Sequence, residues 1–416
     1  MMKKLKFPKY FNVLSVGALS ACLALSPITI HAAEQHVSQE NDDHSSKEKD
    51  GVNKVNEKHS VKSLRFIGEK QIPLNENFEG TTVGGLSGLR YDSKSDTWVM
   101  ISDDRSSYNP ARFYNAKLDY NLKDFHSVQL TGVNFLKQAD GSVYPNQLQY
   151  PTQGGEVPDF ESIEIDPLDG SIWYTSEGDR SLGLNPFVKH ATRDGQYLST
   201  LPLPEIFKVS PIKENGSRNN LSFEGSTFAP DGKSLWVAME GPLYQDGPIP
   251  TTNSGALSRI TQYDRKGNVL GQYAYPVDPI PKAPAPGKYA DNGVSEILAV
   301  NNHELLTIER SGVQGADGSF KNYIRIYEID LNGASDIRNI DSLQKSKLKP
   351  VKKRLILDLN TLGLSKLDNI EGISWGPKLA NGNDSLVLVS DNNFNSSQVT
   401  QFLAFEVLSK KAPIKN

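Results

Sequence analysis

Cysteine is almost absent from this 416-residue chain, which contains one, Cys22, close to its N-terminus. One cysteine cannot form an intramolecular disulfide, so the fold must be stable without covalent cross-links. A surplus of positive charge is also missing, since 45 Lys and Arg stand against 49 Asp and Glu for a formal net charge of −4. Binding to a phosphate backbone depends on such a surplus, and we therefore expect no nucleic-acid partner.

Long apolar runs are lacking beyond the N-terminus, where one covers residues 11–30. Lysines at positions 3, 4, 6 and 9 precede it, and the small residues Ala32 and Ala33 follow it. This order is typical of a secretory signal peptide, which we place at residues 1–32. We expect a secreted, extracellular protein whose mature chain has no transmembrane span. The alternative is a lipid anchor, because Leu19-Ser20-Ala21-Cys22 resembles a bacterial lipobox and would place the lipid on Cys22.

The segment of residues 33–62 is polar and charged and has no aromatic side chain. Such a composition cannot bury enough apolar surface to order itself, so we expect a disordered polar tether. Its histidines, His36, His44 and His59, are interpreted as solvated spacer residues. Residues 411–416 are expected to form a short C-terminal tail.

One internal repeat occurs five times in the rest of the chain. Its copies begin at Gly84, Asp159, Ser222, Gly293 and Asn369. Each copy predicts a strand, a tight turn and a second strand, with turn residues such as Asp166-Pro167-Leu168-Asp169-Gly170. Trp98, Trp173, Trp236, Leu305 and Val387 occupy one position of the repeat and are expected to form a packing layer between units.

Further alternating segments follow each copy and bring the count to four strands per unit. The fifth copy is followed by only one such segment, and an unpaired strand remains at residues 64–74. An N-terminal strand that completes the last sheet closes a ring and removes an exposed edge. We therefore predict an all-β protein, a five-bladed β-propeller over residues 63–410, most simply a monomer. A six-bladed ring is the alternative.

Aligned repeats place five residues at the start of the innermost strands: Ser87, Glu161, Glu224, Ser295 and Glu371. In a propeller these positions converge on the central channel, where three carboxylates would raise one another's pKa unless a cation lay among them. Calcium takes six to eight oxygen ligands in flexible geometry, so we predict Ca²⁺ there. Simple hydration of the channel is the alternative, and a one-residue error in the alignment would exchange Ser295 for Glu296.

The second strand of each unit ends on the same face, where acids and arginines recur. The candidates for a base that activates water are Asp103, Asp104, Glu177 and Asp179. The candidates for substrate binding are Arg105, Arg180, Arg310, Glu240, Glu309, Asp391 and Asn392. Arginines beside a cation suit phosphoryl oxygens, whereas structural salt bridges are the alternative interpretation. No nucleophile elbow, phosphate loop, zinc spacing or dinucleotide motif is present.

The runs GGLSGLRYD, DFESIEIDPLDGSIWYTSEGD, FEGSTFAPDGKSLWVAMEG and NIEGISWGP resemble the phytase-like family described as "esterase-like activity of phytase". The order Ser, Glu, Glu, Ser, Glu around the ring is also similar to that of calcium-dependent apyrases, which are five-bladed propellers. That similarity implies calcium ligation by Ser87, Glu161, Glu224, Ser295 and Glu371. It does not transfer a substrate.

These observations together predict a secreted, calcium-dependent hydrolase that acts on small phosphate esters. Two alternatives stay open. One is a non-catalytic, calcium-stabilised propeller that binds a glycan, a peptide or a cell-wall ligand. The other is a carboxylester or lactone hydrolase.

Overall fold

The computed structural model describes residues 59–410. The predicted signal peptide, Cys22, nearly all of the predicted tether and residues 411–416 lie outside the described residues. Within 59–410, no helix has the length and apolar character needed to cross a membrane.

Residues 59–410 form five four-stranded antiparallel sheets and one two-stranded sheet. Blade 1 contains β4 (Leu86–Asp92), β5 (Thr97–Ser102), β6 (Arg112–Tyr120) and β7 (Phe125–Phe135), and blade 2 contains β8 (Phe160–Ile165), β9 (Ile172–Ser176), β10 (Phe187–Ala191) and β11 (Tyr197–Thr200). Blade 3 contains β12 (Phe223–Phe228), β13 (Ser234–Met239), β14 (Ala256–Asp264) and β15 (Val269–Val277), and blade 4 contains β16 (Gly293–Ala299), β17 (Glu304–Gln314), β18 (Phe320–Asp330) and β19 (Lys352–Asp358). Blade 5 contains β20 (Asn369–Gly376), β21 (Ser385–Asp391), β22 (Thr400–Leu408) and β1 (Ser63–Ile72).

Short elements occupy the connections. The two-stranded sheet is β2 (Asn77–Phe78) and β3 (Thr81–Thr82), and the α-helix is α1 (Tyr150–Gln153). The 3₁₀-helices are η1 (Arg180–Leu182), η2 (Glu205–Phe207), η3 (Tyr244–Asp246) and η4 (Leu359–Thr361).

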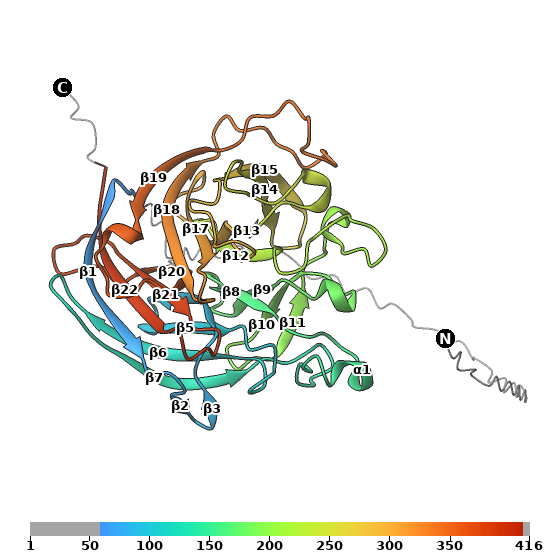
Figure 1. Ribbon diagram of the computed structural model, residues 1–416. Coiled ribbons are helices and arrows are strands. Elements are labelled where there is room, and N and C mark those ends of the chain that lie inside the picture. The colour runs from blue at the N-terminus through green and yellow to red at the C-terminus, as the bar shows by residue number, and fades with distance from the viewer. Residues whose placement is uncertain (1–58, 411–416) are drawn as a thin grey trace, which may run out of the picture. The chain divides into compact units, whose positions relative to one another are not determined.

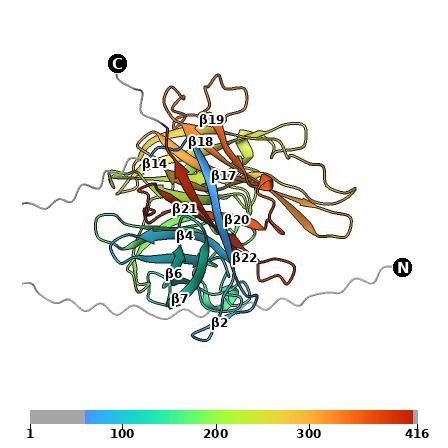
Figure 2. The ribbon, with the colours of Figure 1, turned by 90° about the vertical axis from the view of Figure 1, so that its left-hand side faces the viewer.

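The ring closes as the sequence predicted. Strand β1 pairs antiparallel with β22 from Ser63 opposite Leu408 to Ile72 opposite Thr400. Blue β1 accordingly lies beside red β22 in Figure 1, and the view from the side in Figure 2 shows the same pairing. Each innermost strand also contacts the innermost strands of both neighbouring blades. The five-bladed prediction is confirmed and the six-bladed alternative is wrong.

The predicted packing layer is buried between blades. Trp98, Trp173 and Trp236 are each at most 4% exposed, and Leu305 and Val387 are fully buried. Trp98 and Val387 belong to one apolar cluster although they come from blades 1 and 5. Trp236 and Leu305 likewise share a cluster across blades 3 and 4. Burial of these large side chains at the seams between sheets holds neighbouring blades together.

The described chain begins with contacts to the propeller. The His59 ring stacks on Trp375 at 3.8 Å between centroids, and its Nδ1 lies 2.8 Å from Asp384 Oδ2. Val61 is fully buried in the cluster between blades 4 and 5. His59 is therefore not a solvated spacer, because a tryptophan and a carboxylate of blade 5 bind its ring.

Candidate functional site

Each of the five innermost hairpins contains a register shift at the aligned position of the repeat. The shifts fall between Leu86 and Gly88, Phe160 and Ile163, Phe223 and Ser226, Val294 and Glu296, and Ile370 and Gly372. The residues within them include Ser87, Glu161, Glu224, Ser295 and Glu371. A β-bulge leaves a residue unpaired and re-aims its side chain, which is how five equivalent strands present polar groups at one level. We call these five residues the bulge ring.

The register also places Ser295, and not Glu296, in the bulge of blade 4. Glu296 fills the space beside Gly225, where a Cβ atom would lie 2.5 Å from its Oε1. The hydroxyls of the two ring serines donate to carbonyls of the next blade, Ser87 to Phe160 at 2.7 Å and Ser295 to Ile370 at 3.3 Å. Their oxygen lone pairs remain available to a ligand.

The ends of the second strands form a second set of five equivalent residues. Backbone pairing matches Asp103 with Gly85, Glu177 with Asp159, Glu240 with Ser222, Arg310 with Gly293 and Asp391 with Asn369. Four acids and one arginine thus occupy the same position in five blades. We call Asp103, Glu177, Glu240, Arg310 and Asp391 the strand-end ring.

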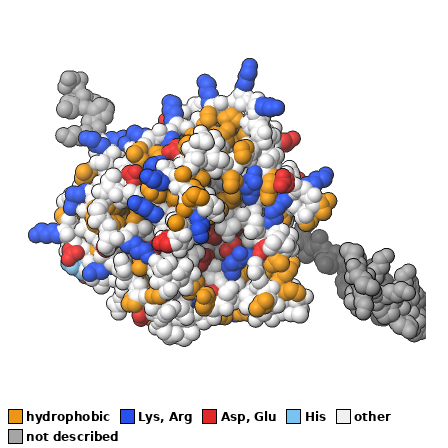
Figure 3. Space-filling view, in the orientation of Figure 1, with side chains coloured by type: hydrophobic (Ala, Val, Ile, Leu, Met, Phe, Trp, Pro, Cys, Tyr) orange, Lys and Arg blue, Asp and Glu red, His pale blue; other side chains and the backbone are white. Residues whose placement is uncertain are grey.

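The two rings and Asp159 bring eight carboxylates together, which we call the acidic mouth: Asp103, Asp159, Glu161, Glu177, Glu224, Glu240, Glu371 and Asp391. Figure 3 shows acidic side chains near the middle of one face, with basic side chains around them. Burial, and then the neighbouring Glu224, raises the pKa of Glu161 well above its usual value. Burial followed by Asp391 raises the pKa of Glu371 to about 8, and burial raises the pKa of Glu240 to about 7 although Arg310 opposes it.

Two arginines lie among these acids. Arg310 Nη2 lies 3.0 Å from Glu240 Oε1, and its Nε lies 3.5 Å from Glu371 Oε1. Arg105 Nη1 lies 3.4 Å from Asp159 Oδ2. The Nε–H groups of both arginines are buried and make no hydrogen bond within the described chain. Two positive charges among eight carboxylates leave a strong excess of negative charge.

The donors of the mouth fit a hard cation. One ligand oxygen each from Asp159, Glu161 and Glu177 lie within 4.8 Å of one another, and so do oxygens of Glu177, Glu224 and Glu240. Oxygens on opposite sides of a calcium ion are separated by about 4.8 Å, since each bond is about 2.4 Å long. The carboxylates of Glu161 and Glu224 make no hydrogen bond or ion pair within residues 59–410, although both residues are at least nine-tenths buried. Buried acids without a donor require either a proton or a cation.

Asp103 differs from the other acids in being less buried. Its carboxylate forms no hydrogen bond or ion pair within the described chain. It lies against Gly85, where a Cβ atom would come within 2.1 Å of Asp103 Oδ1. Burial, and then Asp391 and Glu371, raises the pKa of Asp103 well above its usual value. An accessible carboxyl group with a raised pKa is suited to proton transfer.

Five of the other candidates are held by local contacts. Asp104 pairs with buried Arg112 and accepts the backbone N–H groups of Ser107, Tyr108 and Asn109. Glu309 points to the opposite side of β17 from Arg310 and binds Lys353 and Tyr275.

Asp179 accepts from Arg105 and Gln147 and caps η1. Arg180 donates to four backbone carbonyls between residues 210 and 217, and Asn392 accepts the N–H groups of Gly85 and Phe394. Their predicted roles in catalysis and substrate binding remain predictions, and these contacts position the loops of the mouth.

Three residues further along the inner strands, Arg90 closes the channel. It pairs with Glu164 of blade 2 and donates to the carbonyls of Ser226, Ile297 and Ile373, which belong to blades 3, 4 and 5. Glu296 lies in the same layer and accepts from Ser226 N, Ile297 N and Ser162 Oγ. Arg90 and Glu164 also line a cavity of about 550 Å³, together with His59 and Trp375. The acidic mouth therefore opens to one side only.

Sequence reasoning missed Asp159 and Arg90. Asp159 lies two residues before Glu161, in a column of the repeat that otherwise reads Gly85, Ser222, Gly293 and Asn369. Arg90 lies in a column that reads Arg90, Glu164, Thr227, Leu298 and Ser374. In both cases the aligned repeats offered a signal, because a charged residue stands at a position where most of the other copies have an uncharged one.

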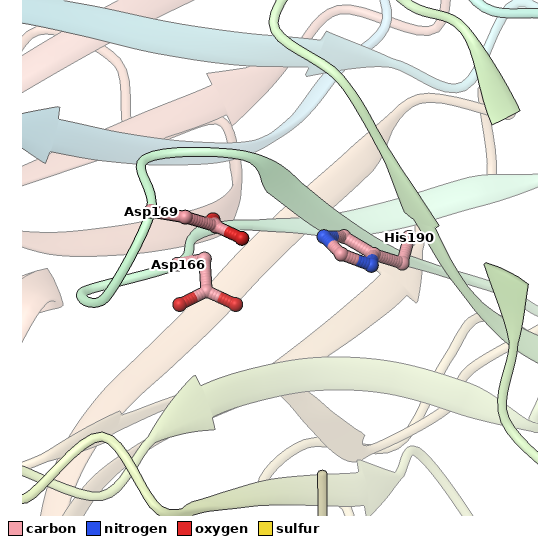
Figure 4. Close-up of side chains that lie close together, drawn as sticks. All are labelled: Asp166, Asp169 and His190. Atoms are coloured by element: carbon pink, nitrogen blue, oxygen red, sulfur yellow. The ribbon is translucent and has the colours of Figure 1, made fainter. Parts of the chain in front are cut away.

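A further group of possible metal ligands lies away from the mouth. Figure 4 shows Asp166 and Asp169 from the turn after β8 and His190 from β10. Asp166 is ion-paired with Arg265 and accepts from Trp173 Nε1 at 2.9 Å. Ser171 Oγ lies at hydrogen-bond distance from both Asp169 and His190, so all three side chains already have partners and this group is a hydrogen-bond network.

The fold and the mouth define a five-bladed β-propeller with carboxylates gathered at one end of its axis. The family model described as "Esterase-like activity of phytase" matches residues 81–394, and the chain therefore belongs to this phytase-like family.

Individual relatives are more distant. An uncharacterized secreted protein of Arthroderma benhamiae is 30% identical over 132 residues, or 26% of this chain and 24% of that protein. The chain thus matches about a quarter of the length of this curated relative. The catalytic domain of a GH62 α-L-arabinofuranosidase from Coprinopsis cinerea has 9% identity and a TM-score of 0.41, covering 84% of this chain and 99% of that chain. The tail fiber of Staphylococcus aureus phage P68 has 12% identity and a TM-score of 0.36, covering 83% and 53%. Likenesses at this level carry no argument about function.

Proposed function

We propose that this chain is an exported, calcium-dependent hydrolase of phosphate esters and that its reaction takes place at the acidic mouth. The observation that carries the proposal is that the mouth contains both carboxylates and guanidinium N–H groups that are buried and make no hydrogen bond. Glu161 and Glu224 are carboxylates without a donor, and Arg105 and Arg310 carry buried Nε–H groups that make no hydrogen bond, although that of Arg310 lies 3.5 Å from Glu371 Oε1. A cation together with an anionic phosphoryl group satisfies both at once.

The cation would be held by Glu161, Glu177, Glu224 and Glu240, with Ser87, Ser295 and Glu371 as further oxygen ligands. Bound calcium supplies positive charge that neutralises phosphoryl oxygens and polarises the bond to the leaving group. The Nε–H groups of Arg105 and Arg310 orient the phosphoryl oxygens.

Asp103 is the proposed general base. It takes a proton from the attacking water as the new oxygen–phosphorus bond forms, the bond from phosphorus to the ester oxygen breaks, and the departing alcohol gains a proton from solvent. The raised pKa of Asp103 favours it over the ion-paired Asp104 and Asp179.

Export through a signal peptide at residues 1–32 is part of this proposal. The description of the Arthroderma benhamiae relative as a secreted protein supports it. The word "esterase-like" in the family description supports a second candidate, a carboxylester or lactone hydrolase at the same mouth.

The test uses the full exported chain, stripped with a chelator, reloaded with calcium and assayed on phosphate esters, carboxylesters and lactones. We expect calcium-dependent turnover of phosphate esters and a loss of about 10²–10⁴-fold in kcat for Asp103→Asn. Glu205→Gln, an exposed acid paired with Lys208, is the control and should retain full activity. Turnover of carboxylesters or lactones alone would favour the second candidate. Stabilisation by calcium without any turnover would identify a non-catalytic propeller that binds a glycan, a peptide or a cell-wall ligand.

A further inference from the structure

Arg105 reaches the acidic mouth from a strained turn that follows β5. Arg105 has φ of 48° and Ser106 has φ of 55°, in the left-handed region that non-glycine residues seldom adopt. Such strain persists where surrounding contacts enforce it. Here the carboxylate of Asp104 enforces it by accepting three N–H groups of the same turn. The turn therefore fixes the point from which the Arg105 side chain leaves the backbone.

Two carboxylates at the mouth end of blade 2 hold the other end of the Arg105 side chain. Its Nη2 lies 2.5 Å from Asp179 Oδ2, and its Nη1 lies 3.4 Å from Asp159 Oδ2. A guanidinium is a rigid planar fork, so contacts at both Nη atoms also fix the direction of its Nε–H. That Nε–H is buried and makes no hydrogen bond within residues 59–410. Its orientation therefore depends on these two acids.

Of the two acids, Asp179 is itself held in place. Its Oδ2 also accepts from Gln147 Nε2 at 2.9 Å, and its Oδ1 accepts from Ser181 Oγ at 2.5 Å and from Leu182 N at 3.2 Å. Burial raises its pKa, but the hydrogen bonds from Ser181 and Gln147 outweigh burial and lower the pKa below its usual value. The Asp159 carboxylate, in contrast, accepts no hydrogen bond within the described chain. Asp179 is therefore the ionised and fixed partner of the arginine.

We propose that Asp179 is a positioning residue, which fixes the Nε–H of Arg105 within the acidic mouth so that it donates to a phosphoryl oxygen of the substrate. This inference rests on the proposed function and gives Asp179 a role other than that of a base. A carboxylate whose oxygens already accept from Arg105, Gln147, Ser181 and Leu182 is poorly placed to take a proton from water. It converts a long, flexible side chain into a directed donor.

The sign of one effect separates positioning from simple electrostatics. A negative charge near a bound anion repels it, so Asp179→Asn would tighten anion binding if Asp179 acted through its charge alone. If Asp179 acts by holding Arg105, the same substitution weakens binding. The asparagine oxygen can still accept from Ser181 and Leu182, but its NH₂ group then faces the Nη2 donor of Arg105 and releases the guanidinium.

The test measures binding of inorganic phosphate to the full, calcium-loaded chain by calorimetry. Asp179→Asn should weaken binding about tenfold, as expected for the loss of one charge-assisted hydrogen bond, and Arg105→Ala should weaken it at least as much. Asp179→Glu keeps the charge but displaces the guanidinium, and should also weaken binding. Unchanged or tighter binding in both Asp179 variants would overturn the inference.

Asp358→Asn is the matched control. Asp358 also caps a 3₁₀-helix, η4, and lies beside an arginine, Arg325, whose carboxylate partners are outside the mouth. Its substitution should leave the phosphate affinity unchanged. Equal weakening in Asp358→Asn and Asp179→Asn would mean that loss of a helix cap is sufficient, and would reject the positioning role.

A second measurement separates this inference from the proposed function. NMR spectroscopy of the arginine Nε–H groups is recorded on the calcium-loaded chain without phosphate, and Arg105 is assigned by the resonance that Arg105→Lys lacks. Its Nε–H should exchange slowly with water in the unsubstituted chain and in Asp358→Asn, and rapidly in Asp179→Asn. Equal exchange rates in all three would show that Asp179 does not hold Arg105. Absence of phosphate binding by the unsubstituted chain would instead reject the proposed function.

Discussion

The acidic mouth and the Arg90 layer lie on the same inner strands, with Arg90 and Glu164 three residues and Glu296 one residue after members of the bulge ring, yet the two layers differ in how their charges are compensated. In the Arg90 layer, one arginine and two glutamates are surrounded by carbonyls, N–H groups and hydroxyls that meet their hydrogen-bonding needs. In the mouth, eight carboxylates share two arginines, and Glu161 and Glu224 have no donor. The hydrogen-bonding groups of the first layer are satisfied within the protein, whereas the buried acids of the second require either a proton or a cation.

The bulges explain how one strand can serve both layers. Skipping a residue at Ser87, Glu161, Glu224, Ser295 and Glu371 turns those side chains toward the mouth. Regular pairing resumes directly afterwards and carries Arg90 into the contacts of the closed layer. A candidate functional site and a structural layer can therefore lie side by side on a single strand.

The largest expected effect on stability comes from disrupting the Arg90 layer. Arg90→Met removes contacts to four blades and leaves Glu164 buried without its partner, so we expect a loss of about 3–5 kcal/mol in the free energy of unfolding. The double variant Arg90→Met/Glu164→Met should recover much of this loss, because no unpaired charge remains. Urea unfolding measures both, and a double variant no more stable than the single one would contradict the account.

Calcium should stabilise the mouth. At a free concentration about a hundred times its dissociation constant, calcium should add about 2.7 kcal/mol, which is seen as a rise in melting temperature over the chelated protein. Glu224→Gln should reduce this rise strongly, whereas the exposed control Glu205→Gln should not. A melting temperature that does not respond to calcium would contradict the proposed calcium site in the mouth.

A smaller effect is expected where Gly225 leaves room for Glu296. A Cβ atom at Gly225 would lie 2.6 Å from Ile297 N and 2.7 Å from Glu296 Cα, so Gly225→Ala should cost about 1–3 kcal/mol. Gly132→Ala is the matched control in outer strand β7, where the nearest atom is Asn115 Nδ2 at 3.3 Å. Thermal unfolding of the two variants should differ clearly, and equal stabilities would contradict the close packing of the blades.

The smallest effect concerns pH. Asp159 and Glu240 have pKa values raised to about 7, so without calcium the folded chain keeps protons that the unfolded chain has released. The free energy of unfolding of the chelated protein should therefore fall as pH rises from about 5 to 8, and calcium should oppose that fall. Glu224→Gln should reduce the fall by about 1 kcal/mol, because it removes a buried carboxyl group whose own pKa is raised by burial and by Glu240. Chemical unfolding at several pH values checks this, and a chelated protein that becomes more stable toward pH 8 would contradict it.

Much of this fold could be predicted from the sequence because each copy of the internal repeat corresponds to one blade. The aligned tryptophans, the turn residues and the unpaired strand at residues 64–74 were sufficient to predict five blades and their closure. The bulge ring was also readable, because its residues share one column of the repeat.

Side-chain contacts between blades and loops could not be predicted from the sequence. Glu309 and Arg310 are neighbours in the sequence, but the alternation of β17 sends only Arg310 into the mouth. Arg180 looked equivalent to Arg105, yet the loop of residues 210–217 binds its guanidinium. These differences depend on which loop lies above which strand, and a repeat alignment does not contain that information.

The pairing of β1 with β22 has a consequence for the order of folding. The first strand of the propeller has no partner until the last one has been made, since Ser63 lies opposite Leu408. Blades 1 to 4 can form their own sheets as the chain emerges, but blade 5 and the ring wait for the C-terminal strand. A chain that crosses a membrane from its N-terminus would therefore complete both rings of the mouth, and with them the proposed calcium site, only after translocation ends.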